Sequence, residues 1–189
     1  MKVYFMSKNK RKIQDAQKAS DLLKLGIEVL HIDYDVEEIQ SGDDKKLIKD
    51  KVIKAFKVLR RPVCVEQTGI YIKEFGNLPG GLTSIVWDNL GAENFCKFFS
   101  RGTNTVLMKS IVGYCDGQNV KVFLGECYGS IAPKATGIRE DRLDRVFIPR
   151  GYYKTFADLG DKKNDISTRI IAFKKFFKYL EGETNGNAM

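Results

Sequence analysis

Two adjacent polar side chains interrupt the apolar run VEQTGIYI at residues 65–72. Glu66 is charged and can take up a proton, whereas the amide of Gln67 exchanges hydrogen bonds but has no basicity. We expect two short strands to meet at a turn at Gly69, with the polar pair where the first strand ends. Such a position is typical of a reaction site, in which only Glu66 can do acid–base chemistry.

A lysine lies among apolar residues in the predicted helix DDKKLIKDKVIKAFKVL, residues 43–59. At about 100° per residue, Lys51 falls within the face formed by Leu47, Ala55 and Val58. Such a lysine either extends to solvent along its alkyl chain or meets a negative charge. The sequence leaves both alternatives open.

A second inward cation, Arg169, interrupts the apolar stripe of the last predicted helix, about residues 161–180. The stripe consists of Ile166, Ile170, Phe173, Phe176, Phe177 and Leu180. Arginine stays charged, and its planar guanidinium presents five donors that suit phosphate. Two inward cations on two helices indicate a cleft that receives a polyanion.

The segment SKNKRK, residues 7–12, joins the first predicted strand to the first helix. Exposed amides at a helix N-terminus favour an anion, although a solvated basic turn has a similar sequence. Farther on, Asp33, Asp35, Glu37 and Glu38 lie at the end of a predicted strand. One of these can hold Mg²⁺, which prefers carboxylate and phosphate oxygens, or the segment is an ordinary solvated loop.

The elements that position these residues alternate between strand and helix. Strands are expected at 2–6 and 27–35, helices at 9–25, 43–59 and 92–100, and a long hairpin at 104–131 with its turn at Asp116-Gly117. This order predicts an α/β or α+β fold with a mixed sheet. We expect a single domain over residues 1–181 and a flexible tail over 182–189.

Composition narrows the partners and the compartment. The net charge of +8 over 189 residues favours an anionic partner, either nucleic acid or a phosphorylated small molecule. No apolar run approaches the roughly 20 residues that span a bilayer. The basic N-terminus is unlike a secretory signal, so we expect a cytoplasmic protein.

The histidine and cysteine content argues against two kinds of site. His31 is the only histidine and no cysteines have CxxC spacing, so a zinc site and a Ser-His-Asp triad are both disfavoured. We interpret His31 as a structural strand residue.

Five segments, taken in order over about residues 2–180, resemble the inosine triphosphate pyrophosphatase family, which hydrolyses non-standard purine triphosphates such as ITP and XTP. The segment FMSKNKRK resembles that family's phosphate loop, and VEEIQSG resembles its acidic metal loop. The segment VEQTG resembles its V-E-D-T-G motif, and KNDISTR resembles its K-N-x-x-S-H-R motif. Between these two, GNLPGG followed by WDNLG resembles its G-L-P-G loop and the helix after it.

The resemblance implies an elongated mixed β-sheet with flanking helices, two lobes, a central cleft and a homodimer. It also implies attack of water on the α-phosphorus with Mg²⁺, giving a monophosphate and pyrophosphate. It assigns Glu38 and Glu66 to the metal and Gln67, Glu66 and Lys51 to catalysis. The substrate-binding set that it implies is Ser7, Asn9, Lys12, Lys51, Asp144, Lys163 and Arg169.

The chain departs from the family pattern at its catalytic and base-reading positions. Gln67 replaces the aspartate that binds metal and activates water. The aromatic F-G-W-D-P that reads the purine corresponds to residues 141–145, where only Asp144 is retained. Thr168 replaces the histidine of S-H-R, and Lys8 replaces the loop glycine. The phosphate-binding residues are therefore retained better than the others.

Three functions follow from these observations. The favoured one is a Mg²⁺-dependent nucleoside triphosphate pyrophosphatase, impaired or altered in specificity, in which Gln67 only orients the water. The second is a non-catalytic nucleotide- or phosphate-binding protein on the same fold. The third, a nucleic-acid-binding derivative, has the weakest support because the chain contains no known nucleic-acid module.

Overall fold

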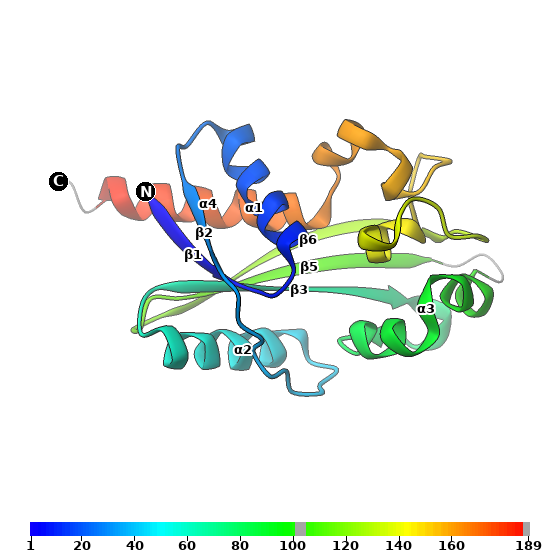
Figure 1. Ribbon diagram of the computed structural model, residues 1–189, viewed down its shortest axis with the longest axis horizontal. Coiled ribbons are helices and arrows are strands. Elements are labelled where there is room, and N and C mark those ends of the chain that lie inside the picture. Colours follow the sequence, from blue (N-terminus) through cyan, green and yellow to red (C-terminus); the bar gives the residue numbers. More distant parts are fainter. Residues whose placement is uncertain (101–104, 187–189) are drawn as a thin grey trace. The chain divides into compact units, whose positions relative to one another are not determined.

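The computed structural model describes residues 1–100 and 105–186, except for the side chains of 139–141 and 183–186 (Figure 1). Its strands are β1 (Lys2–Met6), β2 (Glu28–Ile32), β3 (Val63–Ile72), β4 (Leu78–Gly80), β5 (Val106–Cys115), β6 (Val120–Ile131) and β7 (Phe147–Pro149). Its α-helices are α1 (Lys10–Leu23), α2 (Asp44–Leu59), α3 (Thr83–Phe99) and α4 (Thr168–Gly186). Short 3₁₀ helices are η1 (Lys73–Phe75), η2 (Arg139–Arg145), η3 (Phe156–Asp158) and η4 (Gly160–Asp165).

The strands form one mixed sheet in the order β2-β1-β3-β5-β6-β7, with β4 paired to β3. Strand β1 runs parallel to β2 and β3, whereas β3–β4 and β6–β7 are antiparallel. The predicted mixed sheet with flanking helices is therefore confirmed. Within the described residues, every helix is too short or too polar to span a bilayer.

The chain divides into two compact units. Unit 1 comprises residues 1–67, 110–125 and 169–189, and unit 2 comprises 68–109 and 126–168. Strands β3, β5 and β6 contribute residues to both units.

In unit 1, helices cover both faces of the sheet. Along β3 the side chains alternate: Cys64 belongs to the cluster with α1 and α4, whereas Val63 and Val65 belong to the cluster with α2. This period of two places successive residues on opposite faces. Phe173 of α4 packs on Phe5 of β1 with ring centroids 5.1 Å apart. The helices α1 and α4 thus pack on one face of the sheet and α2 on the other.

In unit 2, aromatic side chains of α3 and η3 pack on a core of mostly aliphatic residues from the strands. Trp87 and Phe95 of α3 contact each other, and Phe147 of β7 contacts Phe156 of η3. Helix α3 begins at Thr83, earlier than predicted, because two helical segments join through Gly91, whose φ is 69°. The positive φ is one that glycine adopts without strain.

The turn predicted at Gly69 is wrong, because β3 is one continuous strand of ten residues. A Cβ at Gly69 would lie 2.8 Å from the carbonyl oxygen of Gly80, so glycine here permits the close approach of β4. Glu66 and Gln67 therefore lie in the middle of a strand.

Other boundaries also differ from the predictions. Strand β2 stops at Ile32, whereas the β5–β6 hairpin with its turn at 116–119 has the predicted connection. Residues 160–165 form a separate 3₁₀ helix before α4. Helix α4 continues to Gly186, into the segment expected to be a tail, and residues 187–189 lie outside the described residues.

Candidate functional site

The segment between β1 and α1 is organised by two short polar side chains. Asn9 caps α1, and its Oδ1 accepts from the amides of Arg11 at 3.0 Å and Lys12 at 3.4 Å. Ser7 Oγ accepts from the amide of Asn9 at 3.1 Å. The cap holds Lys12 in the first turn of the helix, and two of the amides expected to face an anion are bonded to Asn9 instead.

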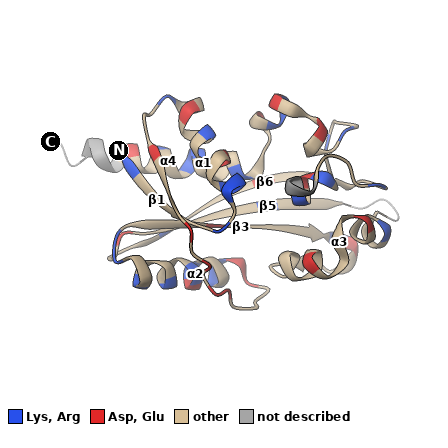
Figure 2. Cartoon of the chain, viewed as in Figure 1, with Lys and Arg blue, Asp and Glu red and all other residues tan. Residues whose placement is uncertain are grey.

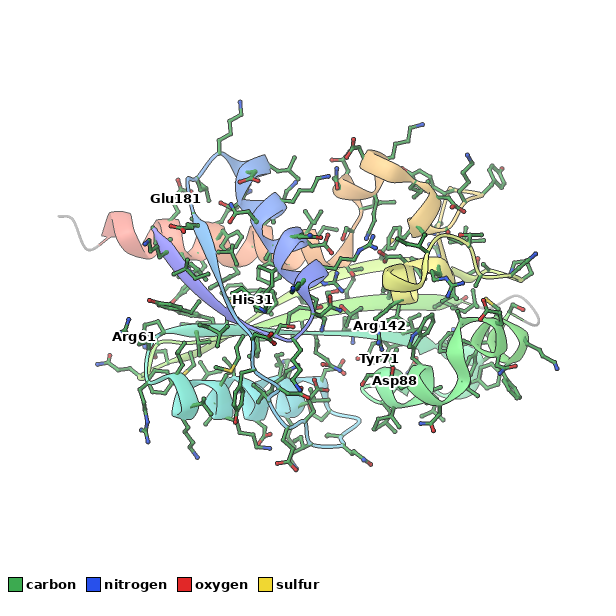
Figure 3. The ribbon with its side chains drawn as sticks, in the orientation of Figure 1. His31, Arg61, Tyr71, Asp88, Arg142 and Glu181 are labelled. Carbon is green, nitrogen blue, oxygen red and sulfur yellow. The ribbon has the colours of Figure 1, made fainter. Side chains whose placement is uncertain are left out.

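His31 supports this loop from β2, where Figure 3 labels it. Its Nε2 lies 2.6 Å from the carbonyl oxygen of Ser7. Because a carbonyl oxygen only accepts, Nε2 must carry the hydrogen. His31 is therefore a support for the loop as well as a strand residue. Nothing in the sequence around this single histidine indicated the contact.

Glu66 is the buried centre of the polar cluster in unit 1. Its side chain has an exposed fraction of 0%. Lys12 Nζ lies 2.8 Å from Oε2, and Arg169 Nε lies 3.4 Å from Oε1. A buried carboxylate requires such partners, so α1 and α4 each deliver one cation to it.

Lys51 reaches the same place from α2, and its contacts decide between the two alternatives left open above. Nζ donates to Glu38 Oε1 at 2.5 Å, to the backbone oxygen of Glu66 at 3.2 Å and to Gln67 Oε1 at 3.4 Å. The residue is only 8% exposed. Lys51 therefore meets a negative charge and does not extend to solvent.

The inward cations are each paired with a carboxylate of unit 1. Arg169 also forms an ion pair with Asp15 of α1. Asp15 was missed in the sequence, although it follows Lys12 by three residues and so shares its helix face. We call Lys12, Lys51 and Arg169 the cation cluster. Figure 2 shows the basic residues along α2 and the acidic segment that precedes it.

The environment of Lys12 depresses the pKa of its ammonium. Burial is the largest cause, and the charges of Lys51 and Arg169 act in the same direction, while Glu66 opposes them. The protonated form is the one that attracts an anion. Lys12 therefore loses its charge at a lower pH than an ordinary lysine, whose pKa is about 10.4.

Affinity for pyrophosphate is accordingly expected to fall as the pH rises through the lowered pKa of Lys12. Lys12→Arg is the control, because a guanidinium does not titrate in this range. Calorimetry over a pH series measures the affinity of both proteins for pyrophosphate. Because the titration of pyrophosphate is the same for both, it cancels when their affinities are compared. Parallel pH profiles for the two proteins would contradict the prediction.

The carboxylates differ in their fitness for a metal ion. The side chain of Glu38 is 32% exposed, whereas that of Glu66 is fully enclosed and faces two cations. Within the described part of the chain, no cluster of three or more His, Cys, Asp or Glu side chains is arranged to hold a metal. Mg²⁺ commonly uses one or two carboxylates together with waters and substrate phosphates. Glu38 fits that mode, and Glu66 fits an ion-pair role better.

The remaining assigned residues lie in unit 2. Asp144 of η2 forms an ion pair with Lys163 of η4, and both side chains are largely buried. Lys163 Nζ also lies 5.7 Å from the ring centroid of Phe156. Beside Asp144, Arg145 donates to the backbone oxygen of Thr136 at 3.0 Å. The sequence had associated Asp144 with Lys163 only through the resemblance.

Two arginines stand where the family pattern is apolar, and each meets a carboxylate of α3. Arg142 donates to Asp88 at 2.9 Å, a pair labelled in Figure 3, and Arg145 to Glu93 at 3.1 Å. The residue between Asp144 and Arg142, Leu143, packs against the core of unit 2. In this structure the carboxylates of α3 hold both guanidinium groups.

Arg142 has a backbone conformation that suits glycine, with φ 45° and ψ −120°. Strain of this kind is worth about 1–3 kcal/mol, whereas its exposed ion pair contributes about 0–1 kcal/mol. Arg142→Gly is therefore expected to raise the free energy of unfolding by about 1 kcal/mol in urea denaturation. Arg142→Ala keeps the strain and loses the ion pair, so equal stability of the two variants would disprove the strain.

Comparisons with known proteins identify the family of the chain. The model of the Ham1 family matches residues 3–179. A dITP/XTP pyrophosphatase of Methanopyrus kandleri is 33% identical over 98% of this chain and 100% of its own length. The fold is similar to that of the Staphylococcus aureus Ham1 protein, with a TM-score of 0.72, 23% identity and coverage of 97% of this chain and 100% of that one.

A HAM1 protein from Coxiella burnetii has the same fold, with a TM-score of 0.79, 18% identity and coverage of 96% of this chain and 99% of that one. The ordered motifs had pointed to one family of nucleotide pyrophosphatases. The family model covers those motifs from the phosphate loop to the arginine of α4. The chain belongs to the Ham1 family.

Proposed function

We propose that this protein hydrolyses non-standard purine nucleoside triphosphates, such as dITP and XTP, to the monophosphate and pyrophosphate. The observation that carries the proposal is the convergence of Lys12, Lys51 and Arg169 at Glu66 and Gln67 in unit 1. Cations held in fixed positions stabilise the charge that develops on phosphate oxygens. A relative 33% identical over nearly the whole chain is a dITP/XTP pyrophosphatase, which supports the same reaction.

The cation cluster and the polar residues beside it have different tasks in this reaction. Lys12, Lys51 and Arg169 bind and orient phosphate oxygens, and the neutral amide oxygen of Gln67 accepts a hydrogen bond from the attacking water. Glu66 holds Lys12 and Arg169 in place. Mg²⁺, when bound, neutralises phosphate charge, and we assign Glu38 to hold it because Glu38 is the accessible carboxylate beside Lys51.

Product analysis tests the proposal. With Mg²⁺ and a panel of dITP, XTP, ITP, ATP and GTP, we expect equal amounts of monophosphate and pyrophosphate, and faster release from the first three. Tight nucleotide binding without product would favour the non-catalytic phosphate-binding alternative. Diphosphate and orthophosphate as products would exclude attack at the α-phosphorus.

Two further expectations from the sequence stay predictions. These are the homodimer and the cytoplasmic location. Sedimentation equilibrium at micromolar concentration tests the first, and fractionation of cells that express the protein tests the second.

A further inference from the structure

Two residues with different expected ligands bind each other in this structure. Glu38, assigned to the metal, accepts from Lys51, assigned to phosphate, at 2.5 Å. We propose that this ion pair competes with both ligands, so that phosphate and metal bind cooperatively by exchanging partners. The inference rests on the proposed function, since it takes the two ligands from it.

The contacts of Lys51 explain why Glu38 is drawn to it. Its other acceptors, the backbone oxygen of Glu66 and the amide oxygen of Gln67, are neutral. The carboxylate of Glu66 faces Lys12 and Arg169. Because a buried ammonium needs an opposite charge, Glu38 supplies it.

The two partners differ in how readily they can move apart. Lys51 lies on α2 and is packed among the residues of its buried face. Glu38 lies in the irregular segment between β2 and α2, and about a third of its side chain is exposed. The exchange therefore proceeds by withdrawal of Glu38 toward solvent while Lys51 stays in place.

The competition depends on the neutral side chain of Gln67, which this chain has beside Lys51. Its Oε1 already lies 3.4 Å from Lys51 Nζ, so a carboxylate at position 67 would give Lys51 a second anionic partner. The neutral amide leaves Glu38 as the counter-ion. Whichever ligand binds first must break the pair between Glu38 and Lys51. Once a phosphate oxygen has bound Lys51, Glu38 is released and a metal ion can bind it without that cost.

The phosphate half of the exchange is tested without metal and without turnover. In the presence of EDTA, Glu38→Gln is expected to bind inorganic pyrophosphate on the order of tenfold more tightly than the parent, as for the loss of one charge-assisted competitor. Glu37→Gln is the matched control, because it removes the same charge from the neighbouring exposed residue. Equal calorimetric affinities for the two variants would overturn the proposal, since general charge repulsion would then explain any gain.

The metal half is tested with Mn²⁺ alone, by the electron paramagnetic resonance signal of the free ion. Lys51→Met is expected to bind Mn²⁺ on the order of tenfold more tightly than Lys57→Met, which removes the same charge from an exposed position of α2. Adding Glu38→Gln to Lys51→Met should abolish the gain. A Lys51→Met protein that binds Mn²⁺ no better than Lys57→Met would overturn the proposal. Since neither arm needs product formation, failure of the pyrophosphatase assay would be seen separately.

Discussion

Gln67→Asp is expected to accelerate release of pyrophosphate from dITP by about 10²–10⁴-fold, the usual value of general-base assistance. An aspartate would supply an acceptor for the proton of the attacking water and a second negative charge toward the metal. Lys51 lies close enough to position 67 to favour the ionised carboxylate. The change should be measured as turnover at saturating dITP and Mg²⁺.

The matched control is Gln67→Asn, which has the length of aspartate without its charge. Position 67 lies within the continuous strand β3, so both variants keep the same backbone and place a shorter side chain there. If the Gln67→Asn and Gln67→Asp proteins turn over equally fast, the gain comes from space for the water and not from basicity. If neither is faster than the parent, position 67 does not limit the reaction.

Periodicity found Lys51 and Arg169 because the signal is local. A charged residue inside an apolar stripe can be recognised from its own helix, and the structure places both side chains inward. Their partners could not be found in this way. Asp15 lies 154 residues from Arg169 in the chain, and Glu38 lies 13 residues from Lys51. Those pairings depend on how α1, α2 and α4 pack on the sheet.

The error at Gly69 has a different physical origin. Glycine favours both turns and positions where another backbone approaches closely. The sequence contains the glycine but not the carbonyl oxygen of Gly80 that occupies the space of its Cβ. The sheet order has the same limitation, since the pairing of β1 with β3 is set by strands that lie far apart in the chain.

Glu66→Gln is expected to lower the free energy of unfolding by about 3–5 kcal/mol, as for removal of one partner from a buried ion pair. The variant would leave Lys12 and Arg169 facing a neutral amide in an enclosed position. Urea denaturation measures the loss, and Glu37→Gln is the control, because Glu37 is exposed and an exposed charge contributes only about 0–1 kcal/mol to stability.

An anion that binds the cation cluster should reverse much of this loss. Pyrophosphate at about 100 times its dissociation constant adds roughly 2.7 kcal/mol to the stability of the protein that binds it, and the Glu66→Gln cluster has one negative charge fewer to repel it. At one pyrophosphate concentration common to both proteins, we therefore expect a larger shift of the melting temperature in Glu66→Gln than in the parent. An equal shift in both proteins would contradict the assignment of Glu66 as the internal counter-ion. The same measurement decides how an inactive Glu66→Gln enzyme is interpreted. If pyrophosphate keeps the variant folded and it is still inactive, Glu66 is needed for the reaction. If activity is lost only because the variant unfolds, Glu66 is needed only for the ion pairs that stabilise the fold.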